Sequence, residues 1–166
     1  MRIAWVVVAV TVLLSSPAAA SPRAAPAGLD AQWCGQSAYL TLARGATGQQ
    51  SVCFMNTGTV SWVLGSATEV GLAVCVDTPA PQFFACNTLS PNADWASNWT
   101  TPRLYAVQPA QIVAPGQQAF FSFAVTAPTT AVPGLPNDAY FRGELVHRAT
   151  GTPIHPVGYY QLIHLM

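Results

Sequence analysis

The chain has 166 residues, of which only 7% are charged, and its basic and acidic residues balance to a formal net charge of zero. Nucleic-acid binding needs a basic surface that displaces counterions, and anionic membrane surfaces attract basic segments, so this composition argues against both kinds of partner. We expect a surface of neutral polar residues that recognises a partner by shape, aromatic contact and neutral hydrogen bonds.

Residues 1–20 have the three parts of a signal peptide. One positive charge, Arg2, precedes an apolar run from Ile3 to Leu14, and small residues end the segment at Ala20. The apolar run is shorter than the roughly 20 residues that span a bilayer. We therefore expect cleavage after Ala20, export to a secreted or extracytoplasmic location, and no stable membrane insertion of the mature chain.

The mature chain is expected to contain one domain. Residues 21–33 are rich in Pro and Ala without any periodicity, which predicts a flexible lead-in. Residues 34–166 have the usual length of a single domain. We therefore assign residues 34–166 to one folded unit.

Short strand-like segments recur along this unit, separated by Pro and Gly, and no window shows a helical period. The predicted strands are residues 37–43, 50–56, 59–64, 69–76, 103–107, 117–127, 139–148 and 157–165. A long connection, residues 77–102, separates the two halves. This pattern predicts an all-β fold, most economically an antiparallel β-sandwich of seven to eight strands.

The clearest alternation lies in residues 117–127. Ala119, Phe121, Phe123 and Val125 are spaced two apart. Residues two apart share one face of a strand, so this face is predicted to point into the core. Pro128 ends the predicted strand.

The segment NTGTVSW, residues 56–62, predicts a hairpin followed by a core tryptophan. Asn56 ends one predicted strand, and Gly58 can adopt a positive φ in a tight turn without steric cost. Trp62 falls in the next predicted strand. We expect its ring to be buried and its indole N–H to find a hydrogen-bond partner.

Together with VAPGQQAFFSFAVTAP, residues 113–128, this segment resembles the four-tryptophan (FW) immunoglobulin-like domain, in the version found in secreted bacterial proteins. The resemblance covers residues 37–165. Its motif residues are Asn56, Gly58, Trp62, Pro115, Gly116, Phe121 and Phe123. It implies an immunoglobulin-like sandwich without catalytic activity, used as a binding or spacer module. Val63 departs from the family, which often has proline there, and the tryptophan expected near residues 155–158 is absent.

Four cysteines follow the predicted cleavage site: Cys34, Cys53, Cys75 and Cys86. An even number in an exported chain indicates two disulfides, with three possible connectivities. We predict the local pairing, Cys34–Cys53 and Cys75–Cys86. A zinc site is the alternative, but no pair has the C-x₂-C spacing typical of such sites, so we predict no metal.

Groups suited to catalysis are few. His147 and His155 flank a predicted turn and are candidates to face one another. Glu144 lies three residues before His147 and so on the opposite face of a strand, which makes a metal triad awkward. No G-x-S-x-G elbow occurs, and nothing marks a carboxylate pair. We therefore predict neither enzyme activity nor a cofactor.

The long connection is predicted to carry the binding surface, because loops of a sandwich are free of the core. Trp95 lies among polar residues and is the candidate for exposure, whereas Trp99 matches a family tryptophan and is implied to fold back as a lid. Folding back of both rings is the alternative. The predicted binding residues are Asn92, Trp95, Asn98, Trp99 and Arg103.

These observations favour a secreted, non-catalytic binding module that acts on protein or on cell-envelope glycan. Two alternatives remain open. One is a structural or assembly domain that pairs with another secreted chain through a sheet edge or apolar face. The other is a small secreted hydrolase, which a pocket with convergent histidine and carboxylate groups would favour.

Overall fold

The computed structural model describes residues 25–78, 84–130, 138–155 and 158–166. The predicted signal peptide and the first part of the predicted lead-in lie outside these residues. In the part that is described, no helix is long and apolar enough to cross a membrane.

The described chain is all-β, with short strands and one 3₁₀ turn, η1 (Ala93–Trp95). The strands are β1 (Ala31–Gln36), β2 (Leu40–Leu42), β3 (Thr47–Asn56), β4 (Trp62–Val63), β5 (Val70–Asp77), β6 (Phe84–Cys86), β7 (Leu104–Val107), β8 (Ile112–Val113), β9 (Gln118–Thr126), β10 (Asp138–His147) and β11 (Tyr159–Leu165).

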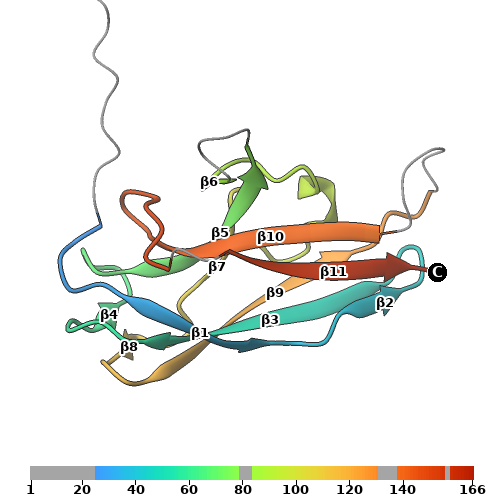
Figure 1. Ribbon diagram of the computed structural model, residues 1–166. Helices are drawn as coiled ribbons and strands as arrows, with labels where there is room; N and C mark the ends of the chain where they lie inside the picture. The colour runs from blue at the N-terminus through green and yellow to red at the C-terminus, as the bar shows by residue number, and fades with distance from the viewer. Residues whose placement is uncertain (1–24, 79–83, 131–137, 156–157) are drawn as a thin grey trace, which may run out of the picture.

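Two sheets form the body of the molecule (Figure 1). The smaller sheet has the order β1-β3-β9 and is antiparallel throughout. The larger sheet has the order β2-β11-β10-β5, and β6 and β7 both pair with β5. One pair departs from the predicted antiparallel arrangement, because β2 runs parallel to β11. β4 and β8 form a separate antiparallel pair.

One apolar core joins the two sheets. Phe54 and Phe121 come from the smaller sheet, while Phe141 and Ile163 come from the larger one, and all four are fully buried. The alternation predicted for residues 117–127 is confirmed, because every second side chain of β9 is buried and Phe120 is exposed. This layered, all-β arrangement is consistent with a β-sandwich.

The predicted disulfides are both present. Cys34–Cys53 joins β1 to β3, and Cys75–Cys86 joins β5 to β6 at directly paired positions. The first bond ties β1 to the sheet, and β1 begins at Ala31, within the segment that we predicted to be a lead-in. The folded unit therefore starts earlier than expected.

The NTGTVSW segment does not form the predicted hairpin, because β3 pairs with β1 and β9 whereas β4 pairs with β8. It is a bend between two strands of different sheets. Asn56 supports it with three hydrogen bonds: Nδ2 donates to the carbonyls of Val60 and Val113 at 3.0 and 2.9 Å, and Oδ1 accepts from the N–H of Gly58 at 3.0 Å. Gly58 does not have a positive φ. Glycine is required because a Cβ there would clash with the backbone oxygen of Gly28.

The motif tryptophan is in the core, as predicted. Trp62 is fully buried in the main apolar cluster. Its indole N–H has no hydrogen-bond partner among the described residues, so the predicted partner is not found. The positive φ belongs instead to Gly116, whose N–H donates to the carbonyl of Asn56 at 2.7 Å. The two motif segments are thus in direct contact.

Candidate functional site

The prediction that Trp95 is exposed was wrong. Only 7% of Trp95 is exposed, and its ring packs edge-on against Phe141 with the ring centroids 5.6 Å apart. The cause is the turn η1, in which the N–H of Trp95 donates to the carbonyl of Asn92. This turn directs the ring inward although its sequence neighbours are polar.

Trp99 folds back over the sandwich, as the resemblance implied. Its ring is edge-on to Tyr105, Phe123 and Phe141, with the Tyr105 centroid 4.6 Å away. Its indole N–H donates to the carbonyl of Ala124 in β9 at 2.8 Å. The side-chain oxygen of Asn98 accepts from the backbone N–H of the same Ala124.

The remaining predicted binding residues also hold the connection in place. Asn92 Nδ2 donates to the carbonyl of Tyr140 at 3.0 Å, and Arg103 Nη1 donates to the carbonyl of Asn87 at 3.2 Å. These contacts hold the connection against the sandwich, and Asn92 and Trp95 also line a pocket of 510 Å³.

Replacing Trp95 with alanine is expected to lower the free energy of unfolding by about 2–3 kcal/mol, because it removes a buried ring from the core. Urea denaturation would measure the loss. Asp94→Ala is the matched control, since Asp94 is exposed in the same turn and should change stability little. An unchanged midpoint for Trp95→Ala would contradict the burial of this ring.

A different pocket, outside the predicted surface, has the properties of a binding site. It lies between β1 and the start of β11 and has a volume of 540 Å³. Its lining residues are Gln32, Trp33, Gln36, Tyr39, His155, Gly158 and Tyr159. Trp33 is 45% exposed and Tyr39 is 47% exposed. None of the described lining residues is Asp, Glu, Lys or Arg. We call it the Trp33 pocket.

The strand β1 places Trp33 at this opening. Trp33 pairs directly with Phe54 of β3, so its side chain lies on the face of the sheet that points toward the core. The strand is the outermost one of the smaller sheet, which leaves the ring at the side of the sandwich. The register then shifts between Trp33 and Gly35, a bulge that the positive φ of Gly35 permits.

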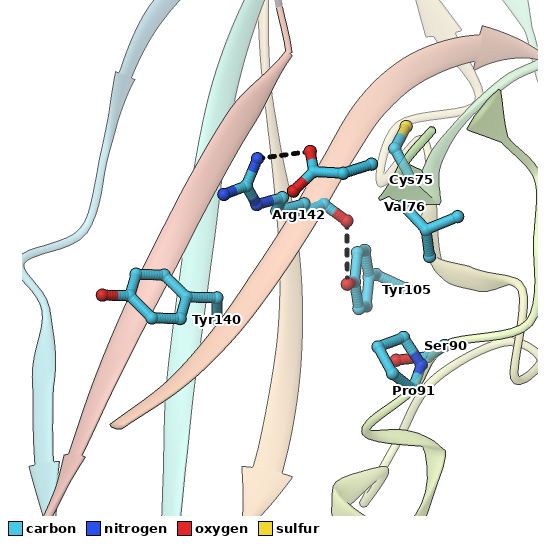
Figure 2. A pocket seen from close by; sticks show the side chains of 8 residues that line it. Cys75, Val76, Ser90, Pro91, Tyr105, Tyr140 and Arg142 are labelled. Carbon is cyan, nitrogen blue, oxygen red and sulfur yellow. Dashed lines mark hydrogen bonds and ion pairs between the residues drawn. The ribbon is translucent and has the colours of Figure 1, made fainter. Parts of the chain in front are cut away.

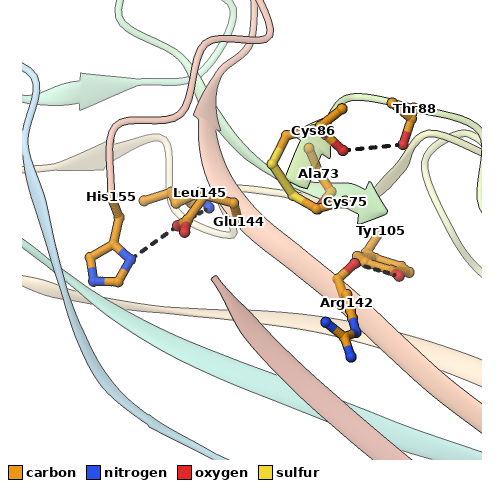
Figure 3. The surroundings of a disulfide bond; sticks show 10 residues. Ala73, Cys75, Cys86, Thr88, Tyr105, Arg142, Glu144, Leu145 and His155 are labelled. Carbon is orange, nitrogen blue, oxygen red and sulfur yellow. Dashed lines mark hydrogen bonds and ion pairs between the residues drawn. A yellow bond between two sulfur atoms is a disulfide. The ribbon is translucent and has the colours of Figure 1, made fainter. Parts of the chain in front are cut away.

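His155 and Glu144 lie together beneath the pocket. Nδ1 of His155 is 3.1 Å from Oε1 of Glu144. Figure 3 draws this contact as a dashed line. The same oxygen accepts the backbone N–H of Leu145 at 2.8 Å. The Glu144 side chain is fully buried, and burial raises its pKa to about 9, so the carboxyl is neutral at neutral pH. When His155 is neutral as well, the His155–Glu144 pair adds no net charge to the Trp33 pocket.

Tyr159 completes the buried polar layer. Its ring lines the Trp33 pocket, while its hydroxyl is buried without a hydrogen-bond partner among the described residues. Burial raises the pKa of Tyr159, and negative charge on Tyr105 or Glu144 would raise it further. Tyr159 is therefore a neutral side chain at this site.

The expected meeting of His147 and His155 does not occur. His147 is held by Thr150 Oγ1 at 2.8 Å from Nδ1 and by the carbonyl of Ala67 at 2.9 Å from Nε2. Sequence reasoning tested Glu144 only against His147 and missed its contact with His155. No three His, Cys, Asp or Glu side chains in the described part of the chain are grouped to hold a metal ion.

A smaller pocket of 230 Å³ lies beside the second disulfide (Figure 2). Its charged groups are paired with each other, since Arg142 Nη1 is 2.6 Å from Asp77 Oδ1. The hydroxyl of Tyr105 donates to the carbonyl of Arg142 at 3.0 Å. These contacts join strands of the larger sheet, so the Trp33 pocket remains the stronger candidate site.

No protein family and no curated protein sequence matches this chain. The assignment of a function therefore rests on the geometry of the Trp33 pocket.

Proposed function

We propose that the protein is an exported, non-catalytic immunoglobulin-like module that binds a neutral glycan in the Trp33 pocket. The strand order supports the fold assignment. In immunoglobulin-like sandwiches the first, second, fourth and fifth strands form one sheet, and the third, sixth and seventh form the other. The described smaller sheet has three strands, so the fourth strand has no counterpart in it. Here β1, β3 and β9 make the smaller sheet, and β5, β10 and β11 belong to the larger one.

The two disulfides support an oxidising compartment outside the cytoplasm.

The half-exposed rings of Trp33 and Tyr39 in one pocket carry the proposal. Aromatic faces pack well against the C–H faces of sugar rings, and Trp and Tyr supply much contact area with few rotatable bonds. The amide groups of Gln32 and Gln36 are suited to sugar hydroxyls. An anionic ligand is disfavoured, because none of the described lining residues is Arg or Lys. A protein ligand is the alternative.

Binding is favoured over hydrolysis by the position of the carboxyl group. A glycosidase needs two carboxyl groups at the substrate. Glu144 is fully buried beneath His155, and the described lining of the pocket contains no carboxylate. The groups that could reach a ligand are thus suited to hydrogen bonding and stacking.

Replacing Trp33 with alanine is expected to weaken glycan binding at least tenfold, about 1.4 kcal/mol, while shifting the melting temperature by no more than about 2 °C. The affinity would be measured by NMR titration with soluble cellotetraose, chitotetraose and mannotetraose, following the backbone amide signals of Gln32, Tyr39 and Tyr159, which the wild type and the variant share. Phe120→Ala is the control, since Phe120 is a similarly exposed aromatic residue of β9 outside the pocket. If none of the three sugars shifts these amide signals of the wild-type protein, the proposed function is wrong.

A further inference from the structure

We propose that Glu144 is a positioning residue of the Trp33 pocket: it holds the imidazole of His155 in one orientation and one tautomer, and His155 contacts the ligand. The inference rests on the proposed function, because it specifies how one wall of that pocket is set. Glu144 itself does not reach the pocket and acts only through His155.

Two contacts fix the plane of the His155 ring. Oε1 of Glu144 lies 3.1 Å from Nδ1, and the Phe54 ring packs edge-on at a centroid distance of 5.2 Å. Only 12% of the His155 side chain is exposed, and the residue lines the pocket. A ring that is held by such contacts and lines the pocket is pre-organised for a ligand.

The contact with Leu145 decides which tautomer the pair favours. Oε1 of Glu144 accepts the backbone N–H of Leu145, and the carbonyl oxygen of a neutral carboxyl is the better acceptor, so this contact favours Oε1 as the carbonyl oxygen. We place the hydrogen of the His155 contact on Nδ1, which then donates to Oε1. Burial keeps the carboxyl neutral, and its own proton then sits on Oε2. One tautomer presents one fixed pattern of donor and acceptor, which is how a second residue tunes a histidine.

A purely structural role explains Glu144 poorly. Oε2 is buried without a hydrogen-bond partner among the described residues, and a buried polar atom of this kind costs stability. Leucine or methionine would fill a similar volume without that cost. The hydrogen bond to His155 is the contact that neither residue could replace.

The first experiment needs no ligand. The nitrogen chemical shifts of the His155 ring would report its tautomer in the wild-type protein, Glu144→Leu and Glu144→Gln, with Glu144→Met as a second apolar variant should the leucine variant not fold. We expect a protonated Nδ1 in the wild type, its loss in the apolar variants, and its retention in Glu144→Gln, whose amide oxygen still accepts. Glu69→Gln is the control, because Glu69 pairs with Arg148. An unchanged tautomer in the apolar variants would overturn the proposal.

The second experiment titrates the same variants with cellotetraose, chitotetraose and mannotetraose. Affinity for the sugar that binds the wild type should fall at least about fivefold in Glu144→Leu and stay near the wild-type value in Glu144→Gln. Glu144→Leu should add no further loss to His155→Ala, because the two residues act as a unit. Equal affinity of wild type and Glu144→Leu would overturn the positioning role. A tautomer change together with no sugar binding by the wild type would instead overturn the proposed function.

Discussion

Replacing Trp62 with alanine is expected to lower the free energy of unfolding by about 3–5 kcal/mol. The ring is fully buried in the main core, and Trp62 itself belongs to the short pair formed by β4 and β8. Removing it leaves a cavity in a part of the molecule where two short strands can repack little. Urea denaturation followed by circular dichroism would measure the loss.

Two further variants separate the causes of this loss. Trp62→Phe should cost less than about 1.5 kcal/mol, because the indole N–H has no hydrogen-bond partner to lose among the described residues. Trp33→Ala removes the same atoms from a half-exposed position and should change stability little. Equal losses for Trp62→Ala and Trp33→Ala would contradict the placement of Trp62 in the core.

Replacing Glu144 with glutamine is expected to stabilise the protein increasingly as the pH rises. Burial raises the pKa of Glu144 from 4.5 to about 9 in the folded state. Between these values the folded protein keeps a proton that the unfolded chain releases. The wild type therefore loses stability with rising pH, by up to about 1.4 kcal/mol per pH unit from this group, and Glu144→Gln removes this dependence.

Urea denaturation at about pH 5 and at about pH 8.5 would measure this effect. We expect the stability difference between Glu144→Gln and the wild type to be small at the acid pH and to grow by several kcal/mol at the alkaline pH. Glu69→Gln serves as the control, since Glu69 is a partly buried carboxylate that is paired with Arg148. Parallel pH profiles for the wild type and Glu144→Gln would show that the carboxyl is already ionised in the folded protein.

The sequence was sufficient for elements that depend on local pattern. The alternation through Phe121 and Phe123 predicted the faces of β9, and the spacing of the cysteines favoured the local disulfides. Two other elements were missed. Pro and Ala before Ala31 hid the strand β1, which is held by pairing with β3. The inward rotation of Trp95 depends on η1, which is too short to show a period.

The site was harder to predict than the fold. Trp33 fell within the expected lead-in, and His155 and Tyr159 are more than a hundred residues away from it along the chain. They line one pocket because the fold brings β1 and the start of β11 together, which spacing along the chain does not reveal. One signal was available: Trp33 directly precedes Cys34, so a disulfide at Cys34 anchors the tryptophan as well.

Residues 96–99 cover part of the outer edge of β9, and this affects whether strands of two copies of the protein can pair. Ala96 bridges to Val125, and both backbone groups of Ala124 are taken up by Asn98 and Trp99. On the opposite side, β1 is short and interrupted by its bulge at Gly35. A long row of free N–H and C=O groups is what recruits strands from other chains into fibrils. The contacts at Ala124 and Val125 and the bulge at Gly35 each shorten the row of backbone groups that a strand of a neighbouring copy could pair with.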